Sequence, residues 1–168
     1  MVIALILLAG GMGIWWFSPA HQRQLRIDDL FAACKAGDLK AVQNALTGGA
    51  GANSKDSNGI TALMVAARGN RPNMSRPEDT DHPDVAQLLI TNGADVNATT
   101  DTGFVALFWA ARYGHAKVVK VLIEKGADSN AKDKDGMTAL KWATTNQSAS
   151  PSHYEKVIGY LHEPERKE

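Results

Sequence analysis

The side chains best suited to chemistry gather in one acidic stretch near the middle of the chain. Its residues are Glu78, Asp79, Asp81, His82 and Asp84. Clustered carboxylates of this kind bind calcium or another hard cation when a loop folds around them. Here the spacing matches no EF-hand loop, and the glycine that turns such a loop is missing. We therefore expect a solvated loop, and an enzyme or metal site on the 70–84 insertion remains a lesser alternative.

No catalytic arrangement is recognisable in the rest of the sequence. It has no H-E-x-x-H or C-x-x-C motif, no phosphate loop with a lysine and no nucleophile elbow. The single cysteine, Cys34, rules out an internal disulfide. It shares the apolar face of an expected helix with Leu30 and Phe31, which favours a buried thiol over a reactive one. We expect a protein that is not an enzyme and that needs no cofactor and no metal.

The charge of the chain argues against broad electrostatic binding. The 18 basic and 18 acidic residues cancel, so the sequence gives no basic footprint for nucleic acid. The length of 168 residues fits one domain of ordinary size. We expect a partner that is another protein, no nucleic acid partner, and a monomeric chain.

Residues 103–131 show the helical pattern most clearly. Two groups of apolar residues recur at three- and four-residue spacing, which predicts two short helices. The groups are Ala106, Leu107, Ala110 and Ala111, then Val118, Val119, Leu122 and Ile123. Gly114 separates the two helices, and Gly126 follows the second where a left-handed residue is expected.

This helix pair recurs along the chain. Gly103 and Gly136 are 33 residues apart and open the matching segments DTGFVALFWA and KDGMTALKWA. The interval from Gly59 to Gly103 is 44 residues, so 11 extra residues lie inside that repeat, in a proline-rich stretch that predicts a loop. Since a pair of short helices cannot bury its apolar face alone, the period predicts a stack of repeats.

These motifs resemble the ankyrin repeat. Its opening D-x-x-G-x-T-P-L-H-x-A-A is matched by DSNGITALMVAA from Asp56 and DKDGMTALKWAT from Asp133. Its closing V-x-x-L-L-x-x-x-G-A-D-x-N is matched by VAQLLITNGADVN from Val85 and VVKVLIEKGADSN from Val118. No repeat keeps the Pro and His of T-P-L-H. The resemblance covers about Asp28 to Leu161, most of the chain, and we expect a small bacterial ankyrin-repeat protein with an N-terminal membrane segment.

The resemblance implies an all-α fold, an ankyrin-repeat solenoid of stacked helix-turn-helix units with short β-turn fingers. Its domain spans residues 27–162, with repeats at about 27–55, 56–99, 100–132 and 133–162. We expect a linker at 21–26, a second insertion at 145–156 and a charged tail at 163–168. Asp28 is the expected cap of the first helix. Asn53, Asn97 and Asn130 recur at one repeat position, where we expect bonds to the local backbone of a turn.

An apolar run precedes the repeats. Residues 2–17 carry no charge and would form a helix of roughly 24 Å, short for a hydrocarbon core of about 30 Å. Trp15 and Trp16 suit the interface at one end of such a helix. We predict a transmembrane anchor or signal segment at 1–20, with a cleaved export signal as the alternative. Arg23 and Arg26 favour a cytoplasmic domain, whereas N-terminal runs of this length favour export, and we expect the periplasmic side.

The resemblance also implies a concave binding surface formed by the finger tips and the outer faces of the first helices. Carried over residue by residue, the protein-binding set is Ser57, Asn58, Ile60, Arg68, Asp101, Thr102, Phe104, Arg112, Tyr113, Lys134, Asp135, Met137, Thr145 and Asn146. Arg112 and Tyr113 are residue types enriched at interface hot spots. In contrast, Phe108, Trp109 and Trp142 are expected in the core, the tryptophans stacked between repeats. His115, with His82 as its counterpart, is expected to bond the backbone between repeats.

The sequence therefore predicts a membrane-tethered or exported module that binds a partner protein. One alternative is an accessory or immunity-type protein that neutralises a toxic enzyme. Rescue of cells that co-express such an enzyme would distinguish the two.

Overall fold

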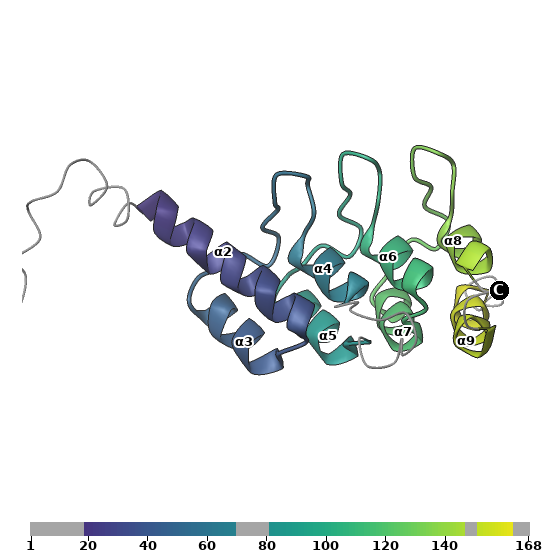
Figure 1. The fold of residues 1–168 in the computed structure, drawn as a ribbon, viewed down its shortest axis with the longest axis horizontal. Helices are drawn as coiled ribbons and strands as arrows, with labels where there is room; N and C mark the ends of the chain where they lie inside the picture. The colour runs from purple at the N-terminus through teal and green to yellow at the C-terminus, as the bar shows by residue number, and fades with distance from the viewer. Residues whose placement is uncertain (1–18, 70–80, 147–150, 163–168) are drawn as a thin grey trace, which may run out of the picture.

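The computed structural model describes residues 19–69, 81–146 and 151–162, and within them the chain is helical. The helices are α2 (Pro19–Ala36), α3 (Leu39–Thr47), α4 (Ala62–Arg68), α5 (Pro83–Thr91), α6 (Ala106–Tyr113), α7 (Ala116–Glu124), α8 (Ala139–Asn146) and α9 (Pro151–His162). Consecutive helices pack in pairs, and the pairs stack side by side (Figure 1). The first helices α2, α4, α6 and α8 form one layer, and α3, α5, α7 and α9 form the other. The predicted helical solenoid is confirmed.

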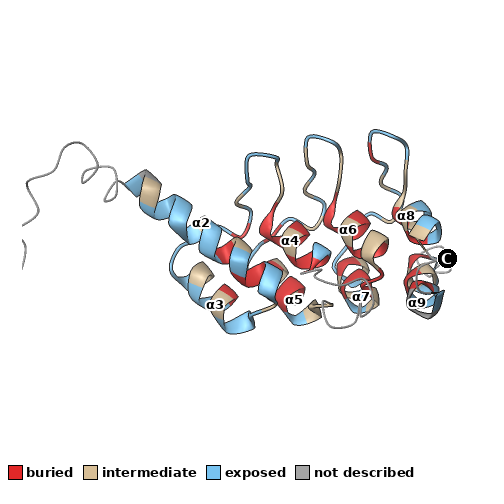
Figure 2. Cartoon of the chain, viewed as in Figure 1, coloured by how far each residue is buried: buried red, intermediate tan, exposed pale blue. Residues whose placement is uncertain are grey.

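The core lies between the two layers and between successive pairs. Leucines recur at equivalent helix positions and are fully buried, among them Leu30, Leu63 and Leu107 (Figure 2). Alanines on the same faces let neighbouring helices approach closely, and Ala66, Ala110 and Ala143 have no exposed surface. The repeat period seen in the sequence therefore corresponds to one continuous core.

Three fingers project from one edge of the stack, each ahead of a first helix (Figure 1). The same backbone bond closes each finger: Asp56 N to Ile60 O, Thr100 N to Phe104 O, and Asp133 N to Met137 O. Gly59, Gly103 and Gly136 turn the tips with φ between 71° and 79°, a region that side chains disfavour. The spacing of these glycines in the sequence thus marks the three turns.

The N-terminal part of the domain differs from the sequence-based expectation. Helix α2 begins at Pro19, so residues 21–26 are helical rather than a linker, and Asp28 lies inside the helix rather than at its cap. Proline suits the first position of a helix because its missing N–H has no helical partner there. Much of the N-terminal half of α2 is exposed (Figure 2). No helix in the described ranges is long and apolar enough to cross a membrane, and the apolar run at 2–17 lies outside those ranges.

The last repeat also differs from expectation. Helix α8 continues through Asn146 and α9 begins at Pro151, so most of the stretch expected as an insertion at 145–156 is helical. Again a proline stands at the helix start. Tyr154, at the end of the first turn of α9, is buried and donates its hydroxyl to the carbonyl oxygen of Arg112 at 2.7 Å. This hydrogen bond links the start of α9 to the end of α6.

Cys34 is fully buried in α2, as its position on the apolar face predicts. Burial raises the pKa of its thiol to about 12, because a thiolate would lose its hydration there. We predict no reaction with Ellman's reagent at pH 8 in the native protein and one thiol per chain after denaturation. Stoichiometric labelling of the native chain would contradict the placement of α2 in the core.

Candidate protein-binding face

The fourteen residues predicted to bind a partner fall into three levels on the finger side of the first helices. Six are exposed at the finger tips: Ser57, Asn58, Asp101, Thr102, Lys134 and Asp135. Three are half-buried where each finger returns to its helix: Ile60, Phe104 and Met137. Five lie at the C-terminal ends of the first helices: Arg68, Arg112, Tyr113, Thr145 and Asn146. The side chains of Thr145 and Asn146 donate hydrogen bonds to the carbonyl oxygens of Lys141 and Trp142 within α8.

Phe104 is the centre of an aromatic group on this face. Its ring centroid lies 5.1 Å from that of Trp109 and 5.5 Å from that of Trp142. It also meets Phe108 edge-on at 5.8 Å, and Tyr113 stacks on Trp109 at 5.9 Å. These distances are typical of attractive ring pairs. A side chain from the base of one finger thus joins the first helices of two repeats.

Two arginines complete the group. The guanidinium of Arg68 lies 5.4 Å from the Trp109 ring centroid, and that of Arg112 lies 4.8 Å from the Trp142 ring centroid. Both distances fall within the range of cation–π attraction. We call Arg68, Phe104, Trp109, Arg112, Tyr113 and Trp142 the aromatic–arginine cluster. It brings together four residues of the predicted binding set and two tryptophans that the sequence places in the core.

The assignment of the tryptophans to the core needs correction. Phe108 is fully buried as predicted, but Trp109 and Trp142 are only half-buried and contribute to the face. Each does contact the preceding repeat, Trp109 through Arg68 and Trp142 through Phe104. Trp142 also donates its indole N–H to Asp133 at 3.0 Å. Their place three residues before Arg112 and Thr145 on the same helix face is the signal that could have found them.

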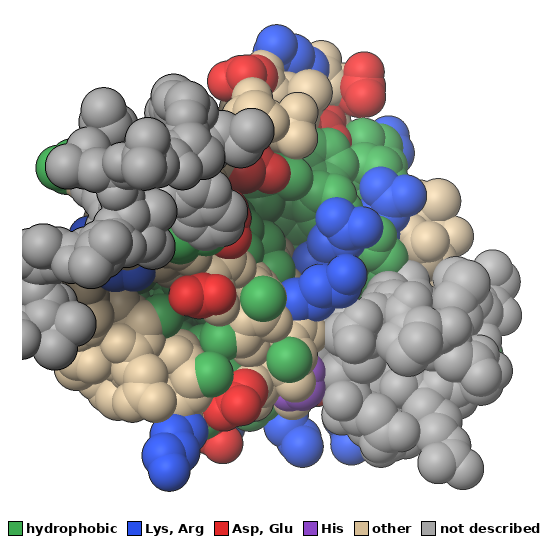
Figure 3. All heavy atoms as spheres, turned by 60° about the vertical axis from the view of Figure 1, so that its left-hand side comes forward, with side chains coloured by type: hydrophobic (Ala, Val, Ile, Leu, Met, Phe, Trp, Pro, Cys, Tyr) green, Lys and Arg blue, Asp and Glu red, His purple; other side chains and the backbone are tan. Residues whose placement is uncertain are grey.

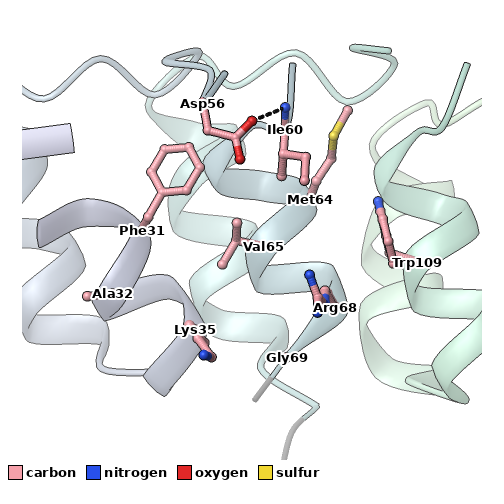
Figure 4. Close-up of a pocket in the computed structure, with 10 residues that line it drawn as sticks. All are labelled: Phe31, Ala32, Lys35, Asp56, Ile60, Met64, Val65, Arg68, Gly69 and Trp109. Carbon is pink, nitrogen blue, oxygen red and sulfur yellow. Dashed lines mark hydrogen bonds between the residues drawn. The ribbon is translucent and has the colours of Figure 1, made fainter. Parts of the chain in front are cut away.

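A groove of about 270 Å³ lies beside the cluster, between α2 and α4 (Figure 4). Phe31 forms one side, and Trp109 closes the far end. Ile60, Met64 and Val65 supply further apolar surface. Its volume is just below the usual range for small-molecule sites, about 300–1,000 Å³. The groove therefore has the size for one large side chain of a partner.

The described part of the acidic stretch, which was the alternative metal site, has a structural role through Asp81. Asp81 accepts hydrogen bonds from the backbone N–H groups of Lys117 at 2.9 Å and Val118 at 3.0 Å. It therefore caps the N-terminus of α7 in the next repeat, where the N-cap residue His115 makes no capping bond. No group of three potential metal ligands occurs in the described ranges. Glu78 and Asp79 lie outside them.

The two histidines that precede second helices also join repeats. His115 is fully buried, with Nε2 3.2 Å from the carbonyl oxygen of Arg68, so the expected inter-repeat bond is confirmed. His82 occupies the equivalent place before α5, and its ring covers Gly37 so closely that a Cβ there would overlap it. Burial lowers the pKa of His82, although Asp81 opposes the shift. Both histidines therefore hold the stack beneath the face.

A family model for ankyrin repeats, described as three copies, matches residues 78–165. The chain belongs to the ankyrin-repeat family. Helices α2, α3 and α4 precede the matched range and continue the same stack. No curated protein matches the chain. Ankyrin repeats generally mediate protein–protein interaction and are typically binding modules rather than enzymes.

The cap provided by Asp81 gives a stability prediction. Asp81→Ala removes both acceptors at the start of α7 and should lower the free energy of unfolding by about 1 kcal/mol. Asp81→Asn keeps one acceptor and should lower it less. Urea unfolding followed by circular dichroism measures both, with Asp101→Ala at an exposed finger tip as the control. Equal stability of Asp81→Ala and the control would refute the capping role.

Proposed function

We propose that this chain captures a partner protein on the finger side of its first helices, with the aromatic–arginine cluster at the centre. The observation that carries the proposal is the half-buried placement of Phe104, Trp109 and Trp142, with one arginine over each tryptophan ring. Aromatic residues and arginine dominate the energy of protein interfaces because they bury large areas and still offer hydrogen-bond donors. A monomeric chain has little reason to keep such a group partly in solvent.

Rigidity supports the same proposal. The cluster rests on helices whose carbonyls and N-termini are bonded across repeats, as with Tyr154 on Arg112 and His115 on Arg68. A face that is already ordered loses little conformational entropy on binding. Binding by such a preformed surface fits a recognition module better than a site that folds around its ligand.

The proposed location is the membrane or the space beyond it. Its support is the uncharged apolar run at residues 2–17, directly before the start of α2. Whether anchored or cleaved, this run would direct the repeats to the periplasmic side.

Removal of two cluster side chains should separate binding from folding. We expect the double variant Arg112→Ala, Tyr113→Ala to weaken partner capture at least about thirtyfold, the loss of one hot spot, with helical content unchanged. The control is Lys117→Ala with Lys120→Ala, which alters two exposed side chains of α7. Affinity capture with each protein as bait, quantified against wild type, is the measurement. Capture at the wild-type level by the Arg112→Ala, Tyr113→Ala variant would refute the assignment of the binding site to this face.

The location has its own test. We expect alkaline phosphatase fused after Glu168 to be active and a fluorescent protein fused at the same point to be dark, because the first folds only after export and the second only in the cytoplasm. The reverse pattern would place the repeats on the cytoplasmic side. Deletion of residues 2–17 is the control and should abolish phosphatase activity.

A further inference from the structure

A row of cations follows the first helices. Lys35, Arg68 and Arg112 each stand in the last turn of their helix, in α2, α4 and α6. Lys35 and Arg68 are 33 residues apart, and Arg68 and Arg112 are 44 apart, which is one period plus the 11 inserted residues. The three therefore occupy one repeat position, and we call them the basic row. Figure 3 shows Lys and Arg side chains in a row beside an apolar surface.

The basic row has no acidic counterpart within the described residues. No carboxylate there lies within ion-pair distance of Lys35, Arg68 or Arg112, and the ion pair found joins Lys120 to Glu124 on α7. Asp56 lines the same groove, but one of its oxygens accepts the N–H groups of Asn58 and Ile60 in its own finger. The nearby finger carboxylate Asp133 is likewise bonded, to the Trp142 indole. Among the described residues the basic row therefore presents three cations that are not paired with a carboxylate, and exposed Asp101 and Asp135 stand at the finger tips beside it.

Helix polarity alone does not account for this arrangement. A cation in the last turn of a helix is favoured by about 0.3–1 kcal/mol, which explains its sign. It does not explain why both guanidinium groups lie on tryptophan faces. Stacking engages the flat face of a guanidinium and leaves the N–H donors in its plane available for a carboxylate. Each guanidinium lies over a tryptophan ring. No hydrogen bond from either arginine side chain is found among the described residues, so the N–H donors of both are available to a carboxylate.

The groove adds an apolar element between the first two cations. It contains Lys35 and Arg68, one from each side, and Phe31 and Trp109 at its ends (Figure 4). Neighbouring packed helices lie about 10 Å apart, so successive cations of the row repeat at about that distance. An extended polyproline-type segment advances about 9 Å in three residues and returns to the same side. Acidic residues at every third position would match the row.

We infer that the partner of this face is an extended acidic segment of another protein, with one large apolar side chain seated in the groove. Its carboxylates pair with Lys35, Arg68 and Arg112, and its apolar side chain lies between Phe31 and Trp109. This inference rests on the proposed function and gives the chemistry of the partner. Nucleic acid fits less well, because the row holds only three cations and exposed Asp101 and Asp135 stand at the finger tips beside it.

Synthetic peptides test this chemistry directly on the full chain in detergent micelles. The probe is a fluorescent peptide with Glu at every third position and one Leu between the first two Glu residues. Its matched controls replace every Glu by Gln, or Leu by Ala. We expect fluorescence anisotropy to show the Glu–Leu peptide binding at least tenfold tighter than the Gln peptide, about the effect of one charged hydrogen bond. The Leu→Ala peptide should bind more weakly, and added salt should weaken the Glu–Leu peptide most.

Protein variants locate the contact. Arg68→Gln and Lys35→Gln should each weaken the Glu–Leu peptide about tenfold and leave the Gln peptide unchanged. Within the described ranges Lys35 makes no ring contact, so its variant separates charge from packing. Lys117→Gln on α7 removes the same charge elsewhere and should have no effect. Thermal unfolding of each variant confirms that it is folded.

Two outcomes overturn the inference. One is equal or absent binding of the Glu–Leu and Gln peptides. The other is tighter binding of a single-stranded oligonucleotide than of the Glu–Leu peptide. Either result, together with partner capture that still depends on Arg112 and Tyr113, would refute the acidic partner while the binding face itself stands. Loss of that dependence would instead refute the proposed function.

Discussion

Side chains of one repeat bond to the backbone of the next, and the stack depends on these bonds. Asn53 donates to Gly93 O and accepts from Asp95 N, both at 2.7 Å. Asn97 makes the same pair of bonds one repeat later, to Gly126 O and Asp128 N. Because buried or terminal backbone groups without partners are costly, no repeat is complete without its neighbour. Hydrophobic burial drives the stacking, and these bonds fix how far each repeat is shifted along the next.

The fold could be predicted because its strongest constraints are local. The 33-residue period, the finger glycines and the three- and four-residue spacing of apolar positions are all visible in the sequence. The asparagines show where local reasoning stops. They were expected to bond the backbone of their own turn, yet Asn53 and Asn97 reach residues of the next repeat. The residue type predicts a bond to the main chain, but only the stack shows which main chain lies within reach.

The site could be predicted in part for the same reason. Phe104, Arg112 and Tyr113 follow from the family pattern of exposed positions, whereas Trp109 and Trp142 were placed in the core. Trp109 occupies the position that Ala32 and Val65 hold in the preceding repeats. The burial of the Trp109 ring depends on its neighbours in three dimensions. Here the ring packs against Phe104 and Arg68 and stays partly exposed. The helical nature of 21–26 was missed because that segment is polar and shows no apolar stripe.

The insertion between α4 and α5 lengthens the second repeat by 11 residues in sequence. It enters after Arg68 and Gly69, on the link to the second layer, so α4 and α6 remain direct neighbours. After the insertion, Asp81 accepts a hydrogen bond from the start of α7, and His82 packs over Gly37 of the preceding repeat. The spacing of the first helices therefore does not depend on the length of the link between α4 and α5. A change in the length of this link should therefore leave the spacing between Lys35, Arg68 and Arg112 unchanged.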